Sequence, residues 1–268
     1  MTPPSISVER DDCDDHQPTL VLLHHFGGSA RTWQPFIACI ANRRRCLALD
    51  LPGFGRQAGH PGPYTVAAMA DHVAAQILDI GLNTYSLVGH SMGGKVALAL
   101  AARCPAGLRS LTLLAPSPPT AEPIDPAQRM MLLAAWGAKP ALAKIVDDVV
   151  VRTLSADLRA TLLEDMLGVS REAWSGWLLL GSREDIAASM AQINVPVLVV
   201  SGDSDTAIPI VIIGTELLPR LADAALAVIT GAGHLLPLEA TAEITRLVLQ
   251  ALNAPVSRAK DQTSGLAQ

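Results

Sequence analysis

Apolar residues recur along this chain in two patterns, as short uniform runs and as longer stretches with a helical repeat. The short runs rich in β-branched residues predict buried strands at Thr19–His24, Cys46–Leu49, Tyr85–Gly89, Leu108–Ala115, Val195–Ser201 and Ala225–Thr230. The longer stretches predict helices at Ser29–Asn42, Thr65–Gly81, Ser91–Arg103, Pro209–Leu218 and Ala240–Leu252. Because strands and helices alternate, we expect an α/β fold with a mostly parallel central sheet and helices on both faces.

One long segment interrupts this alternation, since no strand is predicted from Ser117 to about Met190. It begins with the proline-rich stretch "PSPPTAEPIDP" and continues with predicted helices at Ala127–Trp136, Ala141–Leu154, Ala156–Leu167, Ser170–Leu180 and Ser182–Met190. We interpret residues 117–190 as a helical cap inserted into a core formed by residues 1–116 and 191–256. Residues 257–268 are expected to form a loose tail, and Ile6–Val8 could add an antiparallel edge strand.

Composition narrows the class of protein. The chain has 268 residues, of which 50% are hydrophobic and 17% charged, so it can bury a sizeable core. The net charge of −5 and the lack of a basic stripe argue against a nucleic-acid partner. No apolar run approaches a membrane span, and the first residues lack the pattern of a signal peptide. Four scattered cysteines without a C-x-x-C pair suggest reduced thiols of a cytoplasmic protein, with no metal site.

The strongest local signal is Gly89-His90-Ser91-Met92-Gly93, placed where a predicted strand runs into a predicted helix. Glycines two residues before and after a serine permit a sharp turn that holds the serine in a strained conformation. The following helix directs free N–H groups and its positive dipole end at the same point. A glycine-rich turn without chemistry is the simple alternative, and the partner residues below favour Ser91 as a nucleophile.

A serine hydroxyl needs a base, and seven histidines could supply one. His16 and His60 lie in polar or proline-rich segments and are expected to be exposed. His72 lies inside a predicted helix, and His90 should point away from the serine. His234 follows the last predicted strand in the turn "GAGH", which could carry an imidazole over the sheet edge. His234 is therefore the predicted base, with a helix-capping or loop role as the alternative.

The base in turn needs an acid that orients it. The segment "VLVVSGDSDTAIP" ends a predicted strand and offers Asp203 and Asp205 at the carboxyl edge of the sheet. Asp50 lies at the same edge but precedes the serine in the chain, and we assign it to loop hydrogen bonding. The residues alone leave open which of the other two aspartates shapes the turn and which reaches His234.

These motifs together resemble the α/β-hydrolase family. The resemblance rests on "HHFGGS", "DLPGFG", "GHSMGG", "GDSD…P" and "GAGH", in this order between Thr19 and about Asn253, and on the chain order of serine, aspartate and histidine. In family members with the "G-x-x-D…P" motif the acid is the third residue after the glycine. The resemblance therefore implies Asp205 as the acid, with Asp203 as the alternative, and no cofactor.

The resemblance also gives the loop after the first strand a role. In this family that loop donates one peptide N–H to the oxyanion hole, and the residue after the nucleophile donates another. By position these are the N–H groups of Phe26 and Met92. The chain departs from the family at His25, where glycine is usual, and this side chain could narrow the site or form hydrogen bonds nearby. His24 is expected to be a structural partner of the "DLPGFG" loop.

A serine at the elbow implies hydrolysis of a carboxylic ester, thioester or lactone through an acyl-enzyme. An aspartate would have indicated dehalogenases or epoxide hydrolases, and a cysteine dienelactone hydrolases. A C–C bond hydrolase of ring-cleavage products is the second reading, and a cofactor-free haloperoxidase is a variant of the first. A non-catalytic ligand receptor or scaffold on the same fold is the reading outside enzymes.

Substrate choice is expected to reside in the cap and the loops. Candidate pocket residues are His25, Met130, Trp136, Trp174, Trp177 and Leu235. If several face the site, they form a pocket for an apolar acyl or alkyl group of a small-molecule substrate; the alternative is that they pack the cap itself. Arg56 and Arg152 are weak candidates for binding a substrate carboxylate. The chain could form a homodimer.

Overall fold

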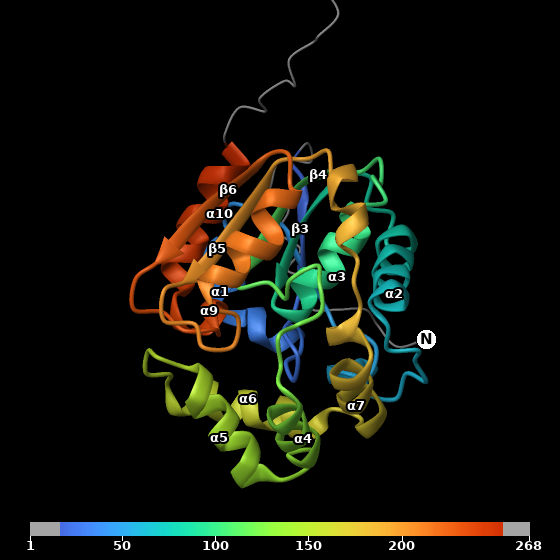
Figure 1. Cartoon of the computed structure of the whole chain (residues 1–268). Coiled ribbons are helices and arrows are strands. Elements are labelled where there is room, and N and C mark those ends of the chain that lie inside the picture. Colours follow the sequence, from blue (N-terminus) through green and yellow to red (C-terminus); the bar gives the residue numbers. More distant parts are fainter. Residues whose placement is uncertain (1–16, 254–268) are drawn as a thin grey trace, which may run out of the picture.

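The computed structural model describes residues 17–253, and its centre is a six-stranded parallel sheet (Figure 1). The strands follow the order β2-β1-β3-β4-β5-β6. Their bounds are β1 Thr19–Leu23, β2 Cys46–Leu49, β3 Tyr85–His90, β4 Leu108–Leu114, β5 Val197–Gly202 and β6 Ala224–Ile229. Each lies within two residues of its predicted position, so the α/β fold class is confirmed. The expected edge strand at Ile6–Val8 and the tail at 257–268 lie outside the described residues.

Helices cover both faces of the sheet. Helices α1 (Gln34–Ile40) and α10 (Thr241–Asn253) pack against each other on one face. Helices α2 (Val66–Asp79) and α3 (Met92–Ala101) pair on the other face. Within β1 the side chains alternate: Leu20 and Leu22 point to the first face, and Val21 and Leu23 to the second. Burial on both sides explains why these strands read as uniform apolar runs in the sequence.

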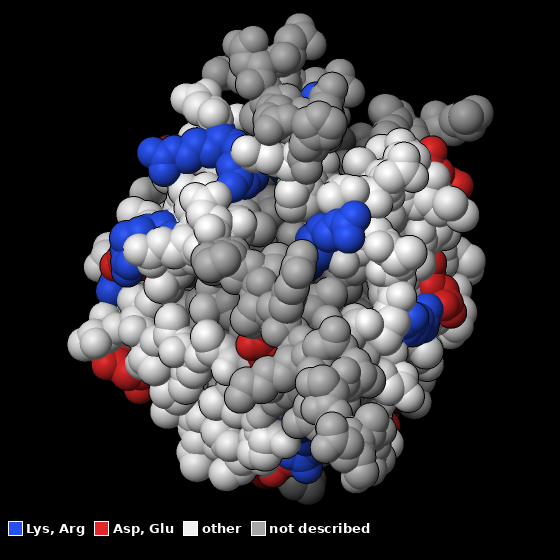
Figure 2. Space-filling model, turned by 90° about the horizontal axis from the view of Figure 1, so that it is seen from above, with Lys and Arg blue, Asp and Glu red and all other residues white. Residues whose placement is uncertain are grey.

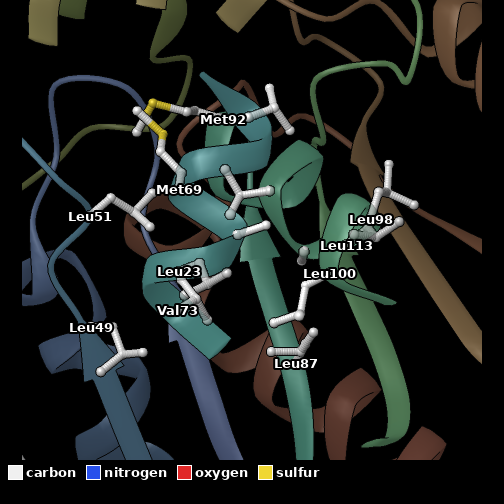
Figure 3. Close-up of a cluster of buried hydrophobic side chains, with 14 of the residues drawn as sticks. Leu23, Leu49, Leu51, Met69, Val73, Leu87, Met92, Leu98, Leu100 and Leu113 are labelled. Carbon is white, nitrogen blue, oxygen red and sulfur yellow. The ribbon is translucent and has the colours of Figure 1, made fainter. Parts of the chain in front are cut away.

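The larger of the two cores lies between the sheet and helices α2 and α3 (Figure 3) and continues into the segment between β4 and β5. Leu87 from β3 and Leu113 from β4 meet Leu23 from β1 and Val73 from α2, and all four side chains are fully buried. Met92, the first residue of α3, directs its side chain into the same cluster. This packing fixes the start of α3 against the end of β3, where the candidate nucleophile lies.

The segment between β4 and β5 is helical, as expected, and lies beside the carboxyl ends of the strands (Figure 1). It contains α4 (Pro126–Ala134), α5 (Lys139–Val149), α6 (Ala156–Gly168) and α7 (Arg171–Leu179). We call this segment the cap. The predicted helix at Ser182–Met190 is wrong, because the chain there forms two short 3-10 turns, Gly181–Arg183 and Ala187–Gln192.

Tertiary hydrogen bonds explain that difference. Glu184, between the two turns, is extended, and its side chain accepts the N–H of Val66 at 2.9 Å. Its carbonyl accepts a hydrogen bond from the buried Lys95 ammonium at 2.6 Å. The N–H of Ile186 donates to the carbonyl of Pro119. A regular helix would need these backbone groups for its own ladder.

The helices after the last two strands are shorter or less regular than predicted. The chain after Pro209 forms α8 (Ile210–Ile212), a π turn at Ile213–Leu217 and a 3-10 turn at Leu218–Arg220. After β6, a short helix α9 (Leu236–Glu239) precedes α10. The first helical region likewise begins as a 3-10 turn at Ala30–Trp33, capped by the Ser29 side chain.

The surface carries charges of both signs. On the face opposite the cap, lysine and arginine side chains lie in small separate groups among neutral residues (Figure 2). Within residues 17–253, no helix combines the length and the apolar character that a membrane crossing requires.

We predict that Leu87→Ala lowers the free energy of unfolding by about 2–5 kcal/mol, because it leaves a cavity in the centre of the sheet. Leu78→Ala on α2 is the matched control, since Leu78 is 78% exposed, and it should change stability by less than about 0.5 kcal/mol. Urea unfolding measures both. Equal effects of the two substitutions would contradict the described packing.

Candidate active site

Ser91 lies between the end of β3 and the start of α3 in an unusual backbone conformation, with φ 52° and ψ −116°. A non-glycine residue seldom adopts this region, and it costs of the order of 1–3 kcal/mol. Main-chain hydrogen bonds hold it: the N–H of Ser91 donates to the carbonyl of Leu114, and its carbonyl accepts from Ser117. The end of β4 and the residues after it therefore fix the turn. The strained conformation itself is the one that the glycine-flanked motif predicted.

Close backbone approaches explain the two glycines of the motif. A Cβ atom on Gly89 would lie 2.5 Å from the carbonyl oxygen of Gly93. A Cβ atom on Gly93 would lie 2.4 Å from the carbonyl oxygen of Leu23 in β1. Neither contact can be relieved without moving main chain, so the turn can form only with glycine at both positions.

The structure brings Ser91, His234 and Asp205 together in one hydrogen-bonded chain. Nε2 of His234 lies 2.9 Å from Oγ of Ser91, and Nδ1 lies 2.8 Å from Oδ2 of Asp205. The other oxygen of Asp205 accepts the N–H groups of Ala207 and Ile208, which orients the carboxylate. All three residues are 7% exposed or less, so water does not compete strongly for these bonds.

Neighbouring charges raise the pKa of the imidazole at the centre of these hydrogen bonds. Burial by itself would lower the pKa of His234, but the adjacent carboxylate of Asp205, with smaller contributions from Glu122 and Glu239, more than offsets this, and the pKa lies above its ordinary value. The carboxylate thus favours the protonated ring, which a general base must become during proton transfer.

The loop that carries His234 is held by a carboxylate that sequence reasoning missed. Glu239 accepts the N–H groups of Gly233 and Leu235 on one side, and those of Val151 and Arg152 in the cap on the other. The available signal was an acidic residue in the first turn after the "GAGH" turn. The N–H of His234 itself donates to the carbonyl of Val149, the last residue of α5.

The other acidic candidates have structural contacts. Oδ1 of Asp203 accepts the N–H of Gly231 and the hydroxyl of Ser204, so Asp203 shapes the turn before His234. Asp50 accepts the N–H groups of Ala30 and Arg56 and pairs with the Arg56 guanidinium at 3.0 Å. Asp205 is therefore the aspartate that reaches the imidazole.

Of the remaining histidines, His24 and His90 are buried and form structural hydrogen bonds, and His60 and His72 are partly buried. His24 accepts the N–H of Leu51 at 3.0 Å, as expected for a partner of the "DLPGFG" loop. His90 is fully buried, and its Nε2 lies 2.8 Å from the carbonyl oxygen of His234, away from the serine hydroxyl. His72 is partly buried within α2, and His60, which we expected to be exposed, is partly buried beside it. His16 lies outside the described residues.

Two peptide N–H groups next to the candidate site are without a partner among residues 17–253. The N–H of Met92 opens α3, and the N–H of Phe26 follows β1; neither has a hydrogen-bond partner in the described part of the chain. The side chain of Met92 points into the core, so only its backbone faces the site. Their role as oxyanion-hole donors, which the resemblance implies, stays a prediction.

A cavity of about 520 Å³ opens onto Ser91 and His234 between the sheet edge and the cap. This volume suits a small-molecule ligand. Most of its wall is apolar, and no lysine or arginine of the described chain is among the lining residues. Glu122, in the proline-rich connector, also lines the cavity, and sequence reasoning missed it. Burial raises the pKa of its carboxyl, which accepts a hydrogen bond from Ser117.

The predicted pocket residues divide evenly. His25, Trp177 and Leu235 line the cavity. The expectation is wrong for Met130 and Trp136, which lie on the outer side of the cap, 65% and 39% exposed. Met130 lies on α4 and Trp136 in the turn after it, whereas the inner face of α4 carries Leu132 to the cavity wall.

Trp174 is also not part of the wall. It is buried behind Phe26, with 4.4 Å between ring centroids, and its indole N–H donates to the carbonyl of Leu132. Both arginine candidates are engaged elsewhere: Arg56 pairs with Asp50, and Arg152 with Glu243, outside the cavity.

Comparison with known proteins gives consistent matches. The pattern of the Alpha/beta hydrolase family matches residues 20–247. The dihydrolipoyllysine-residue acetyltransferase component of the acetoin cleaving system of Pseudomonas putida is 30% identical over 86% of this chain and 62% of its own length. This chain thus spans about three fifths of that relative. The 2-hydroxy-6-oxononadienedioate/2-hydroxy-6-oxononatrienedioate hydrolase of Burkholderia vietnamiensis is 28% identical over 92% of this chain and 91% of its own.

A solved structure is similar over nearly the whole length. The enol-lactonase from Burkholderia xenovorans superposes with a TM-score of 0.77 at 25% identity, covering 92% of this chain and 96% of the other. The similarity therefore includes both the sheet and the cap.

We predict that Ser91→Gly is more stable than Ser91→Ala by about 1 kcal/mol or more. Both substitutions remove the hydroxyl, but only glycine adopts φ 52° without strain. Thermal and urea unfolding of the two variants measure the difference. Equal stabilities would mean that the turn is not strained.

Proposed function

Because this chain belongs to the α/β-hydrolase family, we propose that it hydrolyses a carboxylic ester, a thioester or a lactone through an acyl-enzyme on Ser91. The observation that carries the proposal is the unbroken hydrogen-bonded chain from the Ser91 hydroxyl through His234 to Asp205. This arrangement of a nucleophile, a base and an orienting acid, buried at a cavity wall, is that of a serine hydrolase.

Each group then has a defined task. Oγ of Ser91 attacks the substrate carbonyl carbon while its proton passes to Nε2 of His234. Asp205 stabilises the resulting imidazolium, and the N–H groups of Phe26 and Met92 hold the oxyanion. The imidazolium returns the proton to the leaving alcohol or thiol. Water then attacks the acyl-enzyme by the same route and releases the acid, which restores the serine.

The cavity supports an apolar acyl or alkyl group as the bulk of the substrate. Trp177, Leu235 and Met166 line it, and no lysine or arginine of the described residues does. A substrate with several carboxylates would therefore find no direct charge partner in the wall. For this reason we place ester hydrolysis ahead of C–C bond cleavage of a dienedioate, the kind of substrate named for the Burkholderia vietnamiensis relative.

We expect a fluorophosphonate probe to label Ser91 and Ser91→Ala to abolish both labelling and turnover of p-nitrophenyl esters. Because the cavity holds about 520 Å³, kcat/KM should rise with acyl chain length and fall once the chain outgrows it. Intact-mass spectrometry and a graded ester series measure these outcomes. A protein that never labels would support a non-catalytic receptor, and turnover of a vinylogous diketone without any ester turnover would support the C–C hydrolase.

Asp205→Asn should reduce turnover by up to about 10⁴-fold, because an amide would hold the wrong imidazole tautomer. Asp203→Asn is the matched control, since the amide keeps an oxygen acceptor for Gly231 at an exposed turn. It should cost less than about tenfold. Steady-state kinetics on one ester, with unfolding curves for both variants, provide the test. A larger loss at Asp203 would exchange the two assignments.

A further inference from the structure

His25 occupies a distinctive place in the cavity wall. It is 5% exposed, lines the cavity with Ser91, and directly precedes Phe26 in the chain. The family usually has glycine at this position, which leaves only backbone there. In this chain the imidazole adds a polar ring beside the site. The mechanism above does not use this ring.

Neither ring nitrogen of His25 has a hydrogen-bond partner within residues 17–253, and Nδ1 is fully enclosed by protein. The adjacent histidines differ: His24 and His234 use both ring nitrogens, and His90 uses Nε2. The rings of His25 and His90 are 5.0 Å apart between centroids, and no hydrogen bond joins them. Buried polar groups are nearly always hydrogen-bonded, so this ring is unusual, and Nε2 is the nitrogen that a bound molecule could reach because it is not enclosed.

The protonation state of the ring follows from its surroundings. Burial, and then the neighbouring His90, His24 and His234, place the pKa of His25 well below its ordinary value, so the ring is neutral near pH 7 and carries one proton. An enclosed N–H without an acceptor costs more than an enclosed lone pair. We therefore assign the proton to Nε2, the nitrogen that is not enclosed, in a ring that lines the cavity.

We propose that Nε2–H of His25 donates a hydrogen bond to an acceptor oxygen of the substrate close to the scissile carbonyl. The inference rests on the proposed ester hydrolysis. Because Phe26 would hold the carbonyl oxygen itself and follows His25 directly, the additional oxygen belongs within a few bonds of that carbonyl. The substrate is then an oxygenated ester, with an ether, keto or hydroxyl oxygen near the reacting group, rather than a plain hydrocarbon ester.

The acceptor could belong to the acyl part or to the alcohol part, and two substrate pairs distinguish them. The acyl pair is p-nitrophenyl methoxyacetate and p-nitrophenyl butyrate, in which an ether oxygen replaces a methylene. The alcohol pair is 2-methoxyethyl butyrate and butyl butyrate, with the same replacement. The ratio of kcat/KM within a pair is compared between wild type and variants, which cancels the intrinsic reactivity of each ester.

His25→Phe removes the donor and retains a ring, and it should lower the oxygen-to-methylene ratio by about three- to tenfold in one of the pairs. His25→Gln retains an N–H donor at a similar reach and should keep most of the ratio. His72→Phe, at a partly buried histidine outside the cavity wall, is the control and should leave both ratios unchanged.

The outcomes separate this inference from the proposed function. If wild-type Ser91 is not labelled by the phosphonate, the hydrolase proposal fails. If Ser91 is labelled in His25→Phe and both ratios match those of the wild type, the role of His25 is overturned while the hydrolase proposal stands. Should His25→Phe not label, His25→Gly replaces it with the usual family residue, and an unchanged ratio there has the same meaning.

Discussion

The site depends on one backbone constraint, the strained turn at Ser91. Contacts between main-chain atoms force this conformation: the end of β3, the start of α3 and the end of β1 approach so closely that Gly89 and Gly93 have no room for a side chain. The parallel register with β1 and β4 holds the turn from both sides. The strain at one residue is therefore offset by the stability of the whole sheet, and Ser91 is held at a fixed point of the cavity wall.

Around that point, buried carboxylates organise the loops. Asp205 orients the imidazole. Glu239 accepts the N–H groups of the loop before α9, and Asp50 connects the loop after β2 to the turn before α1. Each accepts at least two hydrogen bonds from main-chain N–H groups, which is how a buried negative charge becomes tolerable. The site is therefore preorganised by the same bonds that close its loops.

Local patterns in the sequence predicted the six strands, because strands buried on both faces are uniformly apolar. The spacing within the "G-x-x-D…P" motif, through the family resemblance, predicted which of Asp203 and Asp205 reaches His234. The sequence could not predict which cap side chains face the cavity. Trp136 and Trp177 both lie in predicted helices of the cap, and only Trp177 reaches the cavity. The final predicted helix of the cap failed because Glu184 is bound to Lys95 and Val66, contacts that exist only after folding.

The bond from the His234 N–H to the carbonyl of Val149 joins the two halves of the molecule at the proposed base. The last turn of α5 thus positions the residue that carries the imidazole and also forms part of the cavity wall. A cap taken from a relative would have to supply a carbonyl at the same position. Without it, the exchange of the cap would change the substrate specificity and also displace the His234 ring. Evolution of new substrate ranges in this chain is accordingly freer in α4, α6 and α7 than at the end of α5.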